Sequence, residues 1–186
     1  MPILSRLFAG KPDPREALRP LWHTVVKVSR AREWYAACGV ADTVAGRFDM
    51  ITAILGVVLL RLERDGDCAR ESALLTELFV EDMDGQLREG GVGDLVVGKH
   101  IGKLMASLGG RIGAYRAALA EGKDAELENA VARNVTLLEG HGPEALARRL
   151  RAFAGELEAI PRAALLAGEI ARLTHRNSRA WSTAAN

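Results

Sequence analysis

The stretch 48–62, FDMITAILGVVLLRL, decides how the rest of the chain can fold. Its apolar residues recur at alternating gaps of three and four, at Phe48, Ile51, Leu55, Val58 and Leu62. This spacing is typical of one face of a helix. Three further residues widen that face, as expected of a helix buried on more than one side: Ile54, Val57 and Leu60. The apolar run is shorter than the ~20 residues of a membrane span, so it predicts a central core helix.

The same helical spacing continues on both sides of this core helix. Apolar residues follow it in the segments 21–35, 74–87, 101–119, 127–138, 146–157 and 165–173. Pro20 is expected to kink or restart the first of these helices, and Gly39 to cap its end. No segment alternates convincingly with period two. The chain is therefore predicted to be all-α, a single compact bundle of about six or seven helices.

The pattern also divides the chain into three parts. Residues 1–13 are predicted to be a flexible N-terminal segment, 14–176 a helical domain and 177–186 a polar C-terminal tail. Five glycines stand in or just before the helix predicted at 101–119, at positions 98, 102, 109, 110 and 113. Each costs a helix ~1 kcal/mol relative to alanine. They predict either a break at Gly109-Gly110 or a close neighbour against this helix.

Composition excludes several classes of protein. The chain has 186 residues, of which 48% are apolar and 26% charged, as in one globular domain. A formal net charge of +1 lacks the basic excess of a general nucleic-acid binder, so no sequence-specific nucleic-acid partner is expected. Cys38 and Cys68 are too few for a disulfide framework or a four-thiolate zinc site. The first eight residues, MPILSRLF, lack the apolar region of a secretory signal, which predicts a cytoplasmic protein.

Charge is unevenly distributed along the chain. Residues 61–94 hold ten acidic and four basic residues, whereas residues 95–120 hold four basic residues and no acidic one. One interpretation is that neighbouring helices pair electrostatically or present solvated faces. The other is that one face is a docking surface for a charged partner.

Candidate catalytic and metal-binding groups are few. The four histidines lack partners at metal-ligand spacing, and the sequence has no phosphate-binding loop or nucleophile elbow. The cluster Glu81-Asp82-Met83-Asp84 is similar to the aspartate-rich magnesium boxes of prenyl-transferring enzymes, but a second box is missing. We therefore expect no enzyme, no metal site and no cofactor. The alternative hypothesis is a helical enzyme that binds an isoprenoid diphosphate through Mg²⁺ at Glu81–Asp84.

Two junctions between loop and helix carry the remaining signal. In the first, DTVAGRFD at 42–49, Asp42 or Thr43 can cap the following helix and Gly46 allows a tight entry. The second, 81–94, is an acidic helix end followed by glycines. Acidic residues near a helix C-terminus oppose the helix dipole. This conflict indicates a functional or ion-paired role for the acidic residues.

The two junctions, in this order, resemble the ubiquinol–cytochrome c chaperone family, assembly factors of the cytochrome bc1 complex in bacteria and mitochondria. The matching text is Trp34-Tyr35, GVADTVAGRFDM at 39–50, EDMDGQLREGGVGDLVVGKHIGKLM at 81–105, Gly110-Arg111 and Tyr115, with a weaker match at Ala130 and Arg133-Asn134. The resemblance covers roughly residues 21–138. Ala41 stands where relatives often carry proline before the Asp-Thr pair.

The resemblance implies a non-catalytic, all-helical assembly chaperone whose partner is newly made cytochrome b or another bc1 subunit. Mitochondrial relatives also act with a small partner protein and at the ribosomal exit, and both partners stay open for this chain. The expected location is the cytoplasm, with peripheral contact at the inner face of the membrane as a further option. A scaffold for another client protein is the third hypothesis.

The two junctions and the basic helix are expected to form the partner-binding surface. Lys99 and Lys103 are four residues apart and share a helix face. Arg111 lies about 80° around the helix from Lys103, close enough to extend that patch. These basic side chains are expected to be free of the core. The candidate partner-binding residues are Asp42, Thr43, Gly46, Arg47, Asp49, Asp82, Asp84, Arg88, Glu89, Asp94, Lys99, Lys103 and Arg111.

Overall fold

The computed structural model describes residues 13–89 and 94–170, and of residues 87–89, 94–100 and 121 it describes the backbone alone. The described residues form a short 3-10 helix and eight α-helices. Their bounds are η2 Pro14–Leu18, α1 Arg19–Ser29, α2 Arg32–Ala36, α3 Val44–Arg64, α4 Ala69–Glu89, α5 Asp94–Glu121, α6 Asp124–Asn134, α7 Glu144–Glu158 and α8 Arg162–Leu166.

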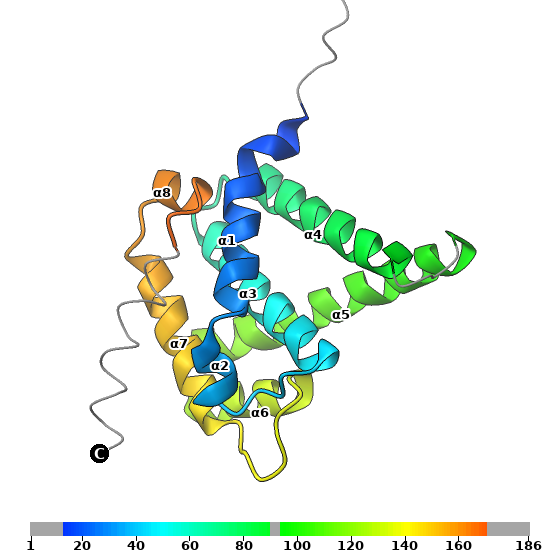
Figure 1. The fold of residues 1–186 in the computed structure, drawn as a ribbon. Helices are drawn as coiled ribbons and strands as arrows, with labels where there is room; N and C mark the ends of the chain where they lie inside the picture. Colours follow the sequence, from blue (N-terminus) through cyan, green and yellow to red (C-terminus); the bar gives the residue numbers. More distant parts are fainter. Residues whose placement is uncertain (1–12, 90–93, 171–186) are drawn as a thin grey trace, which may run out of the picture.

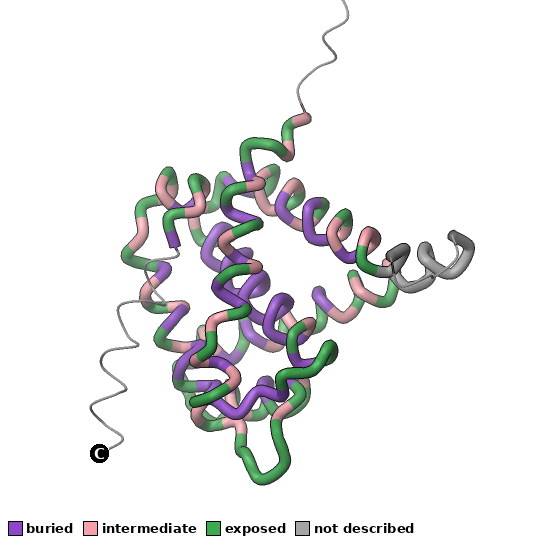
Figure 2. Tube along the Cα trace, viewed as in Figure 1, coloured by how far each residue is buried: buried purple, intermediate pink, exposed green. Residues whose placement is uncertain are grey.

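Helix α3 runs through the middle of the bundle (Figure 1) and contacts α1, α4, α5 and α7. Every residue from Asp49 to Leu62 is buried, and α3 is accordingly purple along most of its length in Figure 2. Helix α6 packs against both α5 and α7, and η2 packs against α4. The predicted all-α class and the central core helix are both confirmed. Within the described ranges, no helix has the length and apolar content to cross a membrane.

The first predicted helix is divided into η2, α1 and α2. Pro14 opens η2, and Pro20 stands in the first turn of α1, so each proline begins a helix instead of interrupting one. The chain turns again after Ser29. The last carbonyls of α1 are satisfied across this turn, because the Trp34 indole donates to the Val28 carbonyl at 2.7 Å and the Tyr35 hydroxyl to the Ser29 carbonyl at 3.0 Å.

The predicted helix at 127–138 ends early, at Asn134. Val135 is extended, and the segment after it pairs with residues 39–41 through the bridge between Val40 and Leu137. The Ala41 amide donates to the Thr136 carbonyl at 2.9 Å, and the Leu138 amide to the Gly39 carbonyl at 2.8 Å. Val135 still reaches the core from this extended backbone. The helix predicted from the spacing of Val135 and Leu138 is therefore wrong beyond Asn134.

Both expectations for the glycines of α5 are wrong where the structure describes them. The helix continues without a break through Gly109-Gly110. A Cβ atom added at Gly102, Gly109, Gly110 or Gly113 would meet nothing within 4 Å. Gly98 lies outside the residues with described side chains. At these four described positions, glycine therefore weakens the helix without allowing a close packing contact that would compensate for the cost.

The entry into α3 depends on close backbone packing. Thr43 is the N-cap, as the sequence predicts, and its hydroxyl accepts a hydrogen bond from the Gly46 amide at 3.1 Å. A Cβ atom at Gly46 would lie 2.0 Å from the Ala41 carbonyl oxygen. Glycine is therefore required at this position by contact between two backbone segments, so its role is structural.

One buried ion pair joins α3 to α5 and to the segment after α6. The Arg111 guanidinium donates to one Asp49 carboxylate oxygen at 2.6 Å. The other oxygen accepts hydrogen bonds from the Thr136 amide at 2.9 Å and from the Thr136 hydroxyl at 2.7 Å. Arg111 also donates to the Thr52 hydroxyl and lies 5.4 Å from the centroid of the Phe48 ring. Every oxygen of this buried carboxylate thus has a partner.

This ion pair corrects the sequence-based expectation for Arg111 and Asp49. Their side chains are only 12% and 9% exposed, and each neutralises the other. Because Arg111 and Lys103 point in different directions around α5, Arg111 faces α3 while Lys103 faces solvent. Arg111 therefore does not extend an exposed basic patch. Asp49 turns inward because α3 is enclosed on all sides at this point.

Breaking the Asp49–Arg111 pair is expected to destabilise the protein strongly. Asp49→Ala leaves the buried Arg111 without its counter-charge, which lowers the free energy of unfolding by ~3–5 kcal/mol. The double variant Asp49→Ala/Arg111→Met removes both charges and loses less than the sum of the two single variants. Urea unfolding followed by circular dichroism measures these differences. Asp42→Ala is the control, because it breaks an exposed pair with Arg47; an equal loss in Asp49→Ala and Asp42→Ala contradicts the prediction.

Two glycine-to-alanine substitutions are expected to have opposite effects. Gly46→Ala forces a methyl group against the Ala41 carbonyl and lowers the free energy of unfolding by ~1–3 kcal/mol. Gly110→Ala places its methyl group in open space and raises the free energy of unfolding by up to ~1 kcal/mol through helix propensity. Thermal unfolding of the two variants beside the parent chain tests this. Shifts of the same sign would contradict the packing described here.

Candidate functional site

The first turn of α3 presents the exposed part of the first junction. Arg47 and Asp42 form an ion pair at 2.6 Å, with side chains 47% and 60% exposed. The hydrogen bond from Arg47 lowers the pKa of the Asp42 carboxyl group. Val44, at the start of the helix, is 87% exposed. Asp42, Thr43, Val44 and Arg47 are therefore available to a partner, whereas Gly46 and Asp49 are buried in the fold.

The described part of the second junction is a set of acidic side chains on α4. Glu81 lies 3.4 Å from Arg15 of η2 and 3.6 Å from Arg19 of α1. Helix α4 continues to Glu89, so Glu81 lies about two turns before its end, where the helix dipole has little effect. The conflict expected from the sequence is therefore absent at Glu81, which is instead ion-paired with two cations. Asp82 and Asp84 are half-buried.

These acidic residues do not assemble a metal centre in the described part of the chain. No group of three or more His, Cys, Asp or Glu residues able to hold a metal ion is found among the described residues. Glu81, the first member of the proposed magnesium cluster, faces two arginines instead. The isoprenoid-diphosphate hypothesis therefore gains no support from the geometry of α4.

For the other five predicted residues, the structure describes the side chain of one and only the backbone of four. Lys103 is exposed on α5, as expected. The backbone of four others lies within helices: Arg88 and Glu89 end α4, Asp94 begins α5, and Lys99 follows in α5. Their side chains lie outside the described residues, so their part in the predicted surface stays a prediction.

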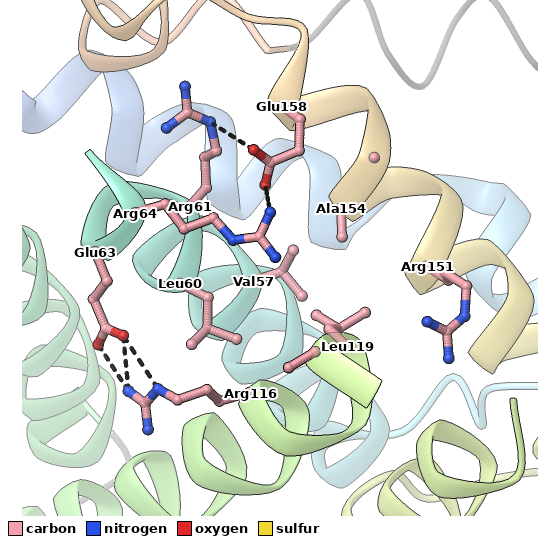
Figure 3. A pocket seen from close by; sticks show the side chains of 12 residues that line it. Val57, Leu60, Arg61, Glu63, Arg64, Arg116, Leu119, Arg151, Ala154 and Glu158 are labelled. Carbon is pink, nitrogen blue, oxygen red and sulfur yellow. Dashed lines mark hydrogen bonds and ion pairs between the residues drawn. The ribbon is translucent and has the colours of Figure 1, made fainter. Parts of the chain in front are cut away.

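The described side chains also form a groove that the sequence did not predict. A cavity of about 490 Å³ opens between α3, α5 and α7 (Figure 3), and it includes no residue of the two junctions. Its floor is apolar, and charged side chains stand around it. The lining residues are Val57, Leu60, Arg61, Glu63, Arg64, Arg116, Leu119, Ala120, Arg151, Ala154, Gly155 and Glu158.

No local sequence signal marks this groove. Arg116 belongs to the basic stretch 95–120, but its partner Glu63, at 2.9 Å, is 53 residues away. Arg64 and its partner Glu158, at 2.7 Å, are 94 residues apart. The groove exists only because α3, α5 and α7 meet in the fold.

The two cysteines are buried and free. Burial raises the pKa of the Cys38 thiol to about 11, which disfavours the thiolate that a nucleophile requires. This agrees with a structural role for Cys38.

The chain matches the family model described as ubiquinol-cytochrome C chaperone over residues 36–173. It is also similar to the crystal structure of the Cbp3 homolog from Brucella abortus, with 29% sequence identity and a TM-score of 0.72. The similarity covers 89% of this chain and 94% of that chain. Comparison with curated proteins finds no match. The family match includes both junctions, α3, α5 and α7, and the chain therefore belongs to the ubiquinol–cytochrome c chaperone family.

Proposed function

We propose that this chain is an assembly chaperone of the cytochrome bc1 complex that binds newly made cytochrome b. The family match over residues 36–173 carries this proposal. In the fold, Asp49 and Arg111 of the shared motif pair with each other inside the bundle, so these two residues are structural. The proposed location is the cytoplasm, at the inner face of the membrane that holds the complex.

The proposed client surface consists of the first turn of α3 and the exposed side of α5 near Lys103. Both parts flank the same ion pair: Asp49 lies just inside the first turns of α3, and Arg111 lies two turns after Lys103. The ion pair therefore fixes where the two exposed parts lie relative to each other. Gly46, Asp49 and Arg111 support this surface from within and are not among its contact residues.

The chemistry of the proposed surface suits a reversible interaction. The Asp42–Arg47 pair is exposed and contributes little to stability, so a partner can open it at small cost. Val44 offers apolar area that the fold itself leaves uncovered. Charges at the rim of an interface mainly set the rate of association and its sensitivity to salt.

A deletion strain tests the function itself. Without this protein, the level of the bc1 complex and the haem spectrum of cytochrome b are expected to fall, because unassembled cytochrome b is not protected. The wild-type gene and a control gene carrying Arg148→Glu, an exposed change on α7, are expected to restore both. Normal cytochrome b haem spectra in the deletion strain would overturn the proposed function.

A charge-reversal variant tests the proposed surface. Lys99→Glu with Lys103→Glu is expected to weaken capture of cytochrome b by the purified chaperone several-fold, most visibly at low salt. Helical content and melting temperature are expected to stay nearly unchanged, because Lys103 is exposed. Unfolding of the double variant would show that the lysines are structural ion-pair partners. Normal capture at low salt would place the client surface elsewhere.

A further inference from the structure

A second groove lies between α1 and α4, close to the point where the described chain begins. Its cavity measures about 470 Å³. Part of its lining is apolar, since Trp22 and Leu78 are buried there and Val26 is half-buried. The other lining residues are Arg19, His23, Glu81, Asp82, Gly85 and Gln86. The proposed client surface includes none of these residues, so the groove is separate from that surface.

Glu81 keeps acceptor capacity in this groove although two arginines stand near it. Arg15 lies 3.4 Å and Arg19 3.6 Å from its carboxylate. The side-chain hydrogen bonds of these arginines go elsewhere. Arg15 donates to Asp13 at 2.6 Å, and Arg19 donates to Glu16 at 2.6 Å. Within the described part of the chain, the carboxylate of Glu81 therefore has ion pairs but accepts no hydrogen bond.

Asp82 adds a second carboxylate, and this one has no partner among the described residues. Its side chain is half-buried in the lining, and no described residue forms a hydrogen bond or an ion pair with it. Around the groove, four carboxylates thus face two guanidinium groups: Asp13, Glu16, Glu81 and Asp82 against Arg15 and Arg19. Charge complementarity therefore favours a cationic occupant.

The chain enters the described fold at the edge of this groove, where η2 leads into α1 (Figure 1). Asp13 is the first described residue, and the guanidinium that binds it also lies 3.4 Å from Glu81 of the lining. Five residue steps join Phe8 to Asp13 and span up to ~17 Å. The lining residues of α1 extend over only ~10 Å. The segment that precedes Asp13 is therefore long enough to lie in the groove.

The composition of residues 1–12, MPILSRLFAGKP, matches the chemistry of the groove. These residues include Arg6 and Lys11 and no acidic residue. Their large apolar side chains suit the apolar lining, and they are Ile3, Leu4, Leu7 and Phe8. Because the segment is tethered beside the groove, its effective concentration there is about millimolar, so individually weak contacts are enough to hold it.

We propose that residues 3–11 of this chain occupy the groove between α1 and α4. The cations of Arg6 and Lys11 lie at its carboxylates, and the apolar side chains of the segment cover its apolar lining. The contact is intramolecular and uses charges that the described fold leaves uncompensated. The inference concerns the free protein and does not rest on the proposed function.

The other basic terminal segment is a weaker candidate for this groove. Residues 171–186 also contain no acidic residue. The chain leads to them past Gly168, whose carbonyl accepts a hydrogen bond from Thr24 at 3.0 Å and whose Cα packs against the Pro20 carbonyl. Neither Thr24 nor Pro20 lines the groove. The N-terminal segment, in contrast, begins at a residue that shares a guanidinium with the lining.

Limited digestion of the full-length chain with trypsin tests the proposal. Trypsin cleaves after Arg6, and mass spectrometry of the chain follows this cut beside the cut after Arg176 in the C-terminal segment. Asp82→Lys reverses a charge in the groove, and Gly85→Trp fills it from a position where an added Cβ meets nothing within 4 Å. Each variant is expected to raise the rate of cleavage after Arg6 at least fivefold. The rate after Arg176 is expected to stay within twofold.

Matched variants control for charge and for bulk. Glu139→Lys makes the same charge reversal in an exposed loop, and Gly113→Trp adds the same side chain at an exposed position of α5 with open space around it. Both are expected to leave cleavage after Arg6 within twofold, and melting temperatures verify that every variant is folded. An unchanged rate after Arg6 in the two groove variants, or an equal rise in the controls, overturns the proposal. A rise confined to Arg176 assigns the groove to the C-terminal segment and also overturns it.

A photo-crosslink identifies the contact directly. Phe8→p-benzoylphenylalanine in the full-length chain is expected to react on irradiation with residues 19–26 or 78–86 of the same chain. Adding Asp82→Lys is expected to lower the yield at least threefold. Crosslinks only to a second copy of the chain would assign the segment to self-association. Binding to phosphatidylglycerol vesicles through this segment, with no crosslink to α1 or α4 in their absence, would assign it to a membrane surface. Either result overturns the proposal.

Discussion

The carboxylate of Asp49 is the constraint on which the rest of the structure depends. It lies within a helix that is buried on every side, where an unpaired charge would strongly disfavour folding. Arg111 supplies the counter-charge from α5, and Thr136 supplies two donors from the segment after α6. That segment in turn pairs with residues 39–41, which lead into α3 itself. The contacts form a closed ring, so the crossing of α3 and α5 and the position of the loop at 39–43 are fixed together.

Two other buried arginines also join neighbouring helices through hydrogen bonds and ion pairs. Arg61, near the end of α3, donates to the carbonyl of Leu157 in the last turn of α7 at 3.2 Å and to that of Ile160 just after the helix at 3.3 Å. Arg149 of α7 pairs with Glu33 of α2 at 3.1 Å and lies over the Trp34 ring. A guanidinium can serve several acceptors at once, which lets it satisfy the ends of helices as well as a carboxylate. The apolar core supplies the general attraction between helices, and these arginines specify which helices meet.

The sequence predicted what depends on neighbouring residues and missed what depends on distant ones. The helical spacing of 48–62 and the Thr43 cap are local, and both predictions are confirmed. Val135 fits a helical spacing equally well, but its segment is extended because residues 39–41 offer it backbone partners almost a hundred positions away. Arg111 looked like a free surface cation because its partner is on another helix. The groove of α3, α5 and α7 could not be predicted for the same reason, since it forms where three helices meet and its Arg64–Glu158 and Arg116–Glu63 pairs join residues far apart in sequence.

Helix α3 is held to its neighbours at both ends. Asp49 joins its first turns to Arg111 of α5, and Arg61 joins its last turns to the end of α7. The proposed client surface begins at Val44, the first residue of α3, so it stands on a helix whose position is set by contacts inside the bundle. The Asp42–Arg47 pair on that surface is exposed and separate from the buried contacts. A client that opens this pair therefore leaves the contacts of α3 intact, and binding does not require the helices to rearrange.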